Sequence, residues 1–145
     1  MTLSEGLELF ALSRSERLGE LTVEIAPEKL VETCHFLKHE LQFERLSSVT
    51  AVDRYPSEPR FEVVYHLQSI AHKERVRLKC LLRGDHPEID SATIVWRSAN
   101  WFEREVFDMF GIHFRNHPDL RRILMPDDWD GHPLRKDYPI AGPRA

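Results

Sequence analysis

Three histidines near the C-terminus have the residue type and spacing that could hold a metal ion. The candidate ligands, taken with two nearby acids, are His113, His117, His132, Asp119 and Asp130. His113 and His117 are four positions apart, which would place both rings on one face of a helix, as in a metal-dependent hydrolase. Gly111 before this pair and Pro118 after it argue against such a helix, and there is no HExxH sequence. We therefore predict no metal site, and we expect the ring beside Pro118 to bond to a backbone carbonyl.

The chain lacks the other sequence patterns that mark a catalytic or cofactor site. Its two cysteines, Cys34 and Cys80, form no CxxC and are fewer than the four thiolates of an iron–sulfur cluster. No GxSxG, GxGxxG or P-loop is present, so the sequence offers no familiar site for a serine nucleophile, NADH or ATP. A net charge of −4 argues against a nucleic-acid-binding module, including an RNA-binding α+β domain. We predict no catalytic residue and no cofactor-binding residue in this chain.

Three short sequences in the C-terminal third carry the strongest signal. They read EREVFDMFGI (residues 103–112), HPDLRRIL (residues 117–124) and GHPLRKDYP (residues 131–139). Together, and in this order, they resemble the C subunit of bacterial NADH:quinone oxidoreductase, which belongs to the 30 kDa subunit family of respiratory complex I. Three linked motifs are far more specific than any one short match.

The resemblance implies a non-catalytic subunit in the peripheral arm of a proton-translocating NADH:quinone oxidoreductase. Such a subunit would hold the quinone-module subunits (the B, D and I types) in register. FMN and iron–sulfur clusters would belong to partner subunits, and quinone would be the substrate of the whole complex. The chain would lie on the cytoplasmic face of the bacterial inner membrane.

Related subunits occur in membrane-bound hydrogenases and in other quinone-reducing complexes, so the electron donor stays open. The full GHPLRKDYP ending favours the quinone reductase.

The resemblance also suggests roles for two sets of charged residues. We expect a helix-anchoring set of buried charges: Glu103, Arg104, Glu105 and Asp108. Arg104 and Asp108 are one helical turn apart and could pair. We expect a second set to contact partner subunits: Arg121, Arg122, Arg135, Lys136 and Asp137. Arginine paired with carboxylates favours oriented docking, and the prolines of this segment reduce the entropy lost when it is fixed against a partner.

Hydropathy periods predict the elements that must position these residues. Period-two alternation indicates strands, and apolar residues at helical spacing indicate helices. The expected elements are a helix over residues 3–18, a strand over 21–25, a helix over 27–41, strands over 43–53, 61–69 and 72–82, and a helix over 101–110. The last two strands should form an antiparallel hairpin, and the final helix should start at Ser98 or Asn100 and end at Gly111.

The expected fold class is α+β, with a small four-stranded sheet, mixed or mostly antiparallel, and packed helices. Residues 1–111 would form this domain, with residues 1–19 as an N-terminal helical segment. Residues 112–145 would form an irregular, extended C-terminal tail that docks on something else. No signal peptide and no membrane-spanning segment is expected from the sequence.

Overall fold

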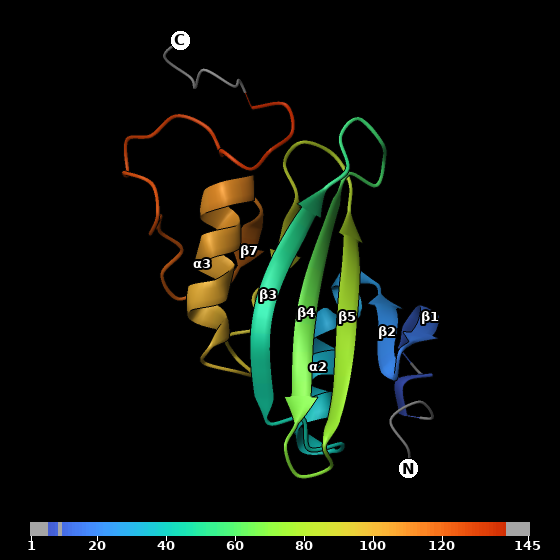
Figure 1. Cartoon of the computed structure of the whole chain (residues 1–145). Helices are drawn as coiled ribbons and strands as arrows, with labels where there is room; N and C mark the ends of the chain where they lie inside the picture. The colour runs from blue at the N-terminus through green and yellow to red at the C-terminus, as the bar shows by residue number, and fades with distance from the viewer. Residues whose placement is uncertain (1–5, 9, 139–145) are drawn as a thin grey trace.

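The centre of the fold is a mixed sheet of five strands (Figure 1). The computed structural model describes residues 6–8 and 10–138. In spatial order the strands are β1 (Ala11–Arg17), β2 (Glu20–Ile25), β5 (Glu74–Leu82), β4 (Phe61–Ser69) and β3 (Arg45–Asp53). Strand β2 is parallel to β5, and the other neighbours are antiparallel. The α+β class is therefore confirmed, although the sheet has one strand more than the four we expected.

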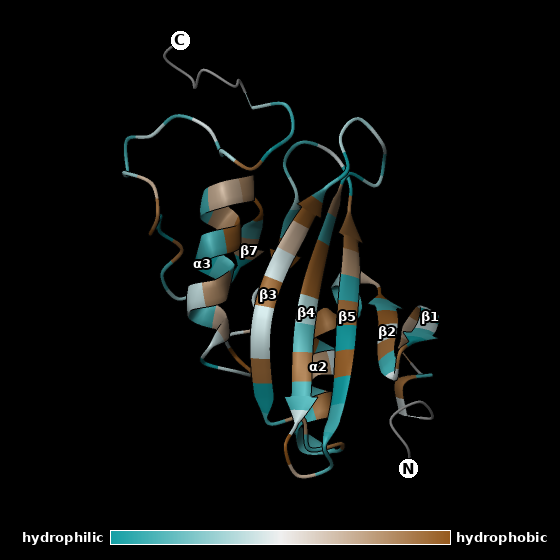
Figure 2. Ribbon diagram, viewed as in Figure 1, coloured by the Kyte–Doolittle hydropathy of each residue, from teal (hydrophilic) through white to brown (hydrophobic). Residues whose placement is uncertain are grey.

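The hairpin of β4 and β5 has the predicted alternation. Tyr65 pairs with Leu78 and Leu67 with Val76, and these side chains are almost fully buried. The outward positions of β5 carry Arg75, Arg77 and Lys79. Figure 2 shows apolar and polar residues in bands along these ribbons. A strand with this alternation buries one face and leaves the other to solvent or a partner.

Helix α2 (Leu30–His39) covers one face of the sheet and follows a short 3-10 turn, η1 (Pro27–Lys29) (Figure 1). Proline suits the start of this segment because its missing N–H would have no helical partner. The predicted apolar stripe is confirmed: Leu30, Cys34 and Leu37 are fully buried. Burial of one such aliphatic side chain stabilises a fold by about 1.5–3 kcal/mol.

The helix predicted over residues 3–18 is wrong for most of its length, although Gly6 and Leu7 are helical. Residues Ala11–Arg17 form β1, an edge strand antiparallel to β2, joined to it by a turn at Leu18 and Gly19. Residues 1–5 and 9 lie outside the described residues. The segment has mostly exposed side chains and thus little apolar pattern, so its structure is decided by pairing with the open edge of β2.

Helix α3 (Ala99–Phe110) lies beside β3 (Figure 1). It begins after Ser98, but that hydroxyl donates to the carbonyl of Leu46 (3.2 Å) instead of capping the helix. Gly111 ends it with φ +75°, a left-handed conformation that glycine adopts without strain, so the predicted C-terminal end is confirmed. Val106 is buried against the core, with Phe102 and Phe110 partly buried beside it.

Part of the predicted irregular tail belongs to the packed domain. Strand β7 (His113–Arg115) pairs in parallel with β6 (Glu88–Asp90), and Ile112 and Phe114 are buried in the core. These residues were expected to be irregular because a three-residue strand gives too short a pattern to detect. Among the described residues, no helix has the length and apolar character needed to cross a membrane.

Candidate functional site

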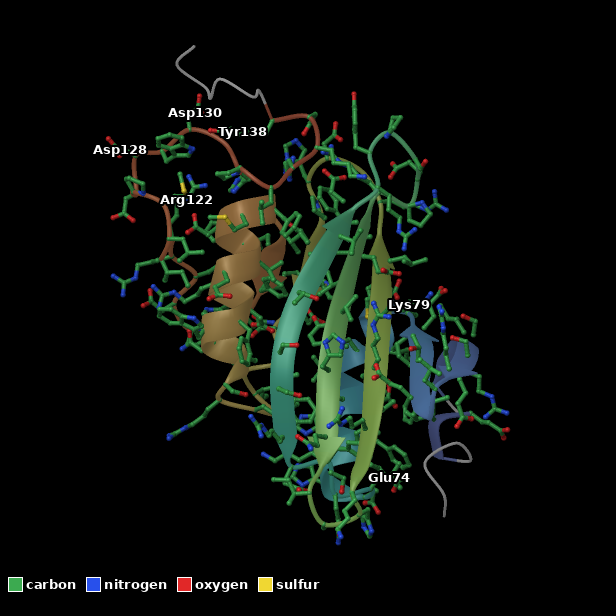
Figure 3. The ribbon with its side chains drawn as sticks, in the orientation of Figure 1. Glu74, Lys79, Arg122, Asp128, Asp130 and Tyr138 are labelled. Atoms are coloured by element: carbon green, nitrogen blue, oxygen red, sulfur yellow. The ribbon has the colours of Figure 1, made fainter. Side chains whose placement is uncertain are left out.

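The candidate site is the segment of residues 116–138, called here the C-terminal strap. It runs over the C-terminal end of α3 and returns to the end of the sheet where β3 finishes (Figures 1 and 3). It contains no regular helix or strand. Irregular backbone must find hydrogen-bond partners outside itself, and side chains of the domain provide them.

Asp108, in the last turn of α3, is the first of these partners. It is fully buried, and one carboxylate oxygen accepts hydrogen bonds from the successive backbone N–H groups of Ile123 (3.1 Å), Leu124 (2.6 Å) and Met125 (2.9 Å). Burial alone would raise the pKa of Asp108, but these N–H groups and the Arg122 guanidinium outweigh it and lower the pKa. The carboxylate is therefore ionised and holds the strap to the helix.

Arg122 completes this anchor from the strap side. Its Nε donates to Asp108 at 2.6 Å, and another guanidinium nitrogen donates to the carbonyl of Trp129 at 2.6 Å. The same side chain also donates to the carbonyls of Asp108 and Gly131, and only 11% of it is exposed. One arginine therefore fixes both ends of the loop over residues 122–131.

A second buried ion pair holds the other end of the strap. Arg60 and Asp53 form two hydrogen bonds, from Nε at 2.8 Å and from Nη2 at 2.9 Å. Asp53 also accepts the backbone N–H of Lys136 (2.8 Å), while Arg60 donates to Asp137 (2.8 Å). Burial opposes ionisation of Asp53, but Arg60 and the neighbouring N–H groups lower its pKa to about 2. This bidentate geometry is the strong form of the arginine–carboxylate contact.

Gly111 allows the strap to approach the end of α3 closely. A Cβ atom at this position would lie 2.6 Å from a ring carbon of His132 and 2.9 Å from a guanidinium nitrogen of Arg135. Arg135 donates to the carbonyl of Phe110 and stacks on the ring of Phe61, with 5.2 Å between guanidinium carbon and centroid. Position 111 therefore requires glycine for two reasons. Its backbone is left-handed, and a Cβ atom there would lie too close to the strap.

The predicted helix-anchoring set divides into two pairs. Glu103 and Asp108 are buried, as expected. Arg104 and Glu105 are only partly buried, so their predicted burial is wrong: Arg104 donates to the carbonyl of Arg121 (3.2 Å), and Glu105 accepts from Trp101 (2.8 Å). Asp108 pairs with Arg122 rather than Arg104, because only the arginine of the strap also reaches the carbonyls of the loop.

Glu103 is buried without a cation beside it among the described residues. Its two oxygens accept hydrogen bonds from the hydroxyl of Ser91 (2.6 Å) and the backbone N–H of Ala92 (2.7 Å). Burial raises the pKa of Glu103 to about 7, although both hydrogen bonds act to lower it. This side chain joins α3 to the segment before it.

The predicted partner contacts also divide. Arg122 and Arg135 are partly buried and bond within the chain, whereas Arg121, Lys136 and Asp137 have exposed side chains. Of these three, Arg121 pairs with Asp119 (2.7 Å) and Asp137 with Arg60 (2.8 Å). Contact of any of the five with a partner stays a prediction. The exposed positions of the strap are Asn116, Pro118, Asp119, Arg121, Leu124, Pro126, Asp127, Asp128, Asp130, Leu134, Lys136 and Asp137.

Asp53 and Arg60 were not predicted as site residues, although one signal in the sequence points to them. In β3 the inward positions run Val49, Ala51, Asp53, so an acid occupies a position whose neighbours face the core. A buried acid implies a buried cation nearby, and Arg60 lies at the start of the next strand. No local pattern indicated that the strap would return to this pair.

Two of the three candidate histidines bond to the backbone, and the third, His113, is exposed. His117 hydrogen-bonds to the carbonyl of Asn100 (3.1 Å), as expected for the ring beside Pro118, and His132 to the carbonyl of Asp108 (2.9 Å). Burial lowers the pKa of both rings. Within residues 6–8 and 10–138, no group of three or more His, Cys, Asp or Glu side chains is placed to hold a metal ion.

Comparison with known proteins gives the same family as the three C-terminal sequences. The family described as "Respiratory-chain NADH dehydrogenase, 30 Kd subunit" matches residues 23–144. The C subunit of the NADH-quinone oxidoreductase of Geobacter sulfurreducens is 54% identical over 142 residues, covering 97% of this chain and 88% of that protein. A C-type subunit of the NADH-quinone oxidoreductase of Rhizobium etli is 55% identical over 120 residues, covering 81% of this chain and 64% of that protein.

Solved structures share the fold. A trypsin-resistant fragment of Nqo5 matches with a TM-score of 0.71 and 32% identity, covering 81% of this chain and 96% of the fragment. A chain of the membrane-bound sulfane sulfur reductase, an archaeal respiratory membrane complex, matches with a TM-score of 0.82 and 26% identity, covering 95% of this chain and 84% of that one. The chain therefore belongs to the family of the 30 kDa subunit of respiratory-chain NADH dehydrogenase.

Proposed function

We propose that this chain is a structural subunit of a proton-translocating NADH:quinone oxidoreductase, and that the C-terminal strap docks it on the quinone-module subunits. It would have no catalytic centre of its own. The quinone-module partners would be of the B, D and I types, and FMN and iron–sulfur clusters would lie in partner subunits. This chain would lie on the cytoplasmic face of the bacterial inner membrane as a peripheral subunit.

One observation carries this proposal: the domain holds an irregular strap in place through two buried ion pairs. Asp108 and Arg122 fix one end, and Asp53 and Arg60 fix the other. The outward side chains of the strap make few contacts with the rest of the chain. A segment held in this way loses little entropy when a partner binds it, which favours specific docking.

The curated relatives support the NADH-dependent complex, because they are NADH-quinone oxidoreductase subunits. The sulfane sulfur reductase chain supports a second candidate, the equivalent structural role in a related respiratory complex with another electron acceptor or donor. A scaffold that binds no donor is compatible with either reaction. The proposed role is the same in both: to keep partner subunits at the spacing that electron transfer requires.

The test is a double charge reversal on the outward face of the strap, Arg121→Glu with Lys136→Glu. Arg135 is not used, since its side chain holds the strap to α3 and Phe61. The tagged variant would be purified from gently solubilised membranes and assayed for NADH:quinone reductase activity. We expect co-purified partner subunits to fall about tenfold or more, as expected when a charged contact is reversed, with an unchanged melting temperature of the isolated chain.

The matched control reverses two exposed cations at the β4–β5 turn, at the end of the sheet away from the strap, Lys73→Glu with Arg75→Glu (Figure 3). It changes the net charge equally and should leave assembly intact. Normal assembly of the strap variant would contradict the docking role of these two residues. Co-purification of hydrogenase or sulfur-reductase subunits with the unmodified chain would favour the second candidate.

A further inference from the structure

A basic groove lies on the face of the sheet that carries no helix. It has a volume of about 480 Å³ and lies between the β1–β2 hairpin and the strands β5 and β4. Its charged residues are Arg17, Arg54, Arg77, Lys79, Glu20 and Glu62. Four cations and two carboxylates leave a surplus of two positive charges, in a chain whose net charge is −4. Lys79 marks this face in Figure 3.

Two of the four cations have no carboxylate partner among the described residues. Glu62, with 5% of its side chain exposed, pairs with Arg54 at 3.2 Å and with Lys79 at 3.8 Å. Arg17 and Arg77 form no ion pair with any described residue, and the buried Nε of Arg77 has no hydrogen-bond partner among them. Both arginines line the groove without a carboxylate partner in the described part of the chain, so their guanidinium groups can pair with an oxyanion supplied from outside the chain.

Leu18 lies at the edge of the same groove in an unusual conformation. It forms a two-residue turn with Gly19 between the paired residues Arg17 and Glu20, and it has φ +52°. Asparagine or aspartate is the usual residue at this turn position, because a larger side chain is strained there. The side chain of Leu18 is 98% exposed, so no contact within the described chain offsets this strain.

We propose that the groove and Leu18 form a second docking surface, which binds an acidic segment of another subunit of the complex. A carboxylate of that segment accepts hydrogen bonds from Arg17 and Arg77, and a neighbouring apolar side chain covers Leu18. This inference rests on the proposed function, because it requires a partner subunit. The family match begins at residue 23, so Arg17 and Leu18 lie outside it.

Charge and shape favour a protein segment over a free anion or a membrane surface. A free phosphate could use the arginines but not the exposed leucine. A lipid surface is broad, whereas this site is a groove bounded by the β1–β2 hairpin and the strands β5 and β4. The hairpin and the strap lie at opposite edges of the sheet (Figure 1), so two partners can bind at once.

The experiment is site-specific photo-crosslinking of the full chain in native membranes. A photo-reactive leucine analogue replaces Leu18, Leu134 of the strap, or Ile70 in the β4–β5 turn, which are all well exposed. We expect position 18 to crosslink a segment of another subunit in which mass spectrometry finds a carboxylate beside an apolar residue. Position 70 is the background control, and position 134 tests the strap.

Charge variants then test the assigned contacts. Arg17→Glu, and separately Arg77→Gln, should each lower the crosslink from position 18 about tenfold, while Arg83→Glu should not. Replacing the acidic residue of the identified segment with a basic one should restore the crosslink from position 18 in the Arg17→Glu variant. Leu18→Asn should leave the melting temperature of the free chain equal or higher, while weakening assembly.

The outcomes separate the two proposals. The second docking surface is overturned if position 18 crosslinks no more than position 70, crosslinks only lipid, or reaches a segment without carboxylates, while position 134 still crosslinks a subunit. If neither position 18 nor position 134 crosslinks a subunit and the chain purifies alone, the proposed function itself fails.

Discussion

The β4–β5 hairpin and the C-terminal strap are held in place by different forces. In the hairpin, apolar side chains such as Tyr65 and Leu78 alternate on one face and pack into the core. In the strap, a few charged groups bond to irregular backbone, with Asp108 as the principal acceptor. Apolar packing tolerates many sequences of the right pattern, whereas the strap depends on particular atoms at particular positions.

The largest expected effect is on the hairpin. Leu78→Ala removes a fully buried side chain from the centre of the sheet and should lower the free energy of unfolding by about 4 kcal/mol. Chemical denaturation measures this value. The exposed Val52→Ala is the control and should change stability by less than about 0.5 kcal/mol. If Leu78→Ala lowered the free energy of unfolding by less than Val52→Ala does, apolar packing would not be what stabilises this region.

Asp108→Asn tests the strap with almost no change in side-chain shape. Removing one charge of a buried pair should cost about 3 kcal/mol. We expect hydrogen exchange at the backbone N–H groups of residues 123–125 to accelerate and trypsin to cleave after Arg121 or Arg122 sooner. The exposed Asp130→Asn provides the control within the same segment. If hydrogen exchange in Asp108→Asn accelerated equally in the sheet and in the strap, the hairpin and the strap would not be stabilised separately.

Glu103→Gln tests the second buried acid of α3, which differs from Asp108 because no cation lies beside it among the described residues. The pKa of Glu103 is raised to about 7 from an ordinary value of 4.5. As pH rises, the carboxyl group therefore loses its proton at a lower pH in the unfolded chain than in the folded chain. Stability is therefore fully present below about pH 4.5 and falls as pH rises towards 7, by about 3 kcal/mol in total. The glutamine side chain of the variant has no such proton to lose.

Melting temperatures of the wild-type chain and Glu103→Gln, measured from pH 4 to pH 8, check this prediction. The two curves should nearly coincide at pH 4 and separate by pH 8, with the variant more stable. Parallel curves over the whole range would show that Glu103 titrates normally. Asp53 has the opposite sign: its pKa of about 2 gives stability that is lost only as pH falls below about 3.8.

Periodicity predicted the elements that bury an apolar face. Helix α2 and strands β2, β4 and β5 were located because their patterns continue for several residues. Strand β1 was missed because its structure depends on an open edge elsewhere in the sheet, which no local pattern records.

The same reason explains the error at Asp108. Helical spacing favoured Arg104, four residues earlier, over Arg122, which lies across a loop and reaches more acceptors. The inward position of Asp53 was visible in the sequence, but its partners in the strap lie 83 residues away. Ion pairs between distant segments leave no periodic trace, so the geometry of the strap could not be predicted.

The position of the strap in the chain also bears on how the protein is made. Its receiving residues, Asp53, Arg60 and Asp108, all precede it in the sequence, so the ribosome synthesises them first. The strap can bind only when these three side chains are in place, so its closure depends on the folding of the domain that holds them. The strap then closes on a finished receiving surface, and the proposed docking face forms last. A translation product that stops before residue 116 would present no such face, so the order of synthesis would itself keep incomplete chains out of the complex.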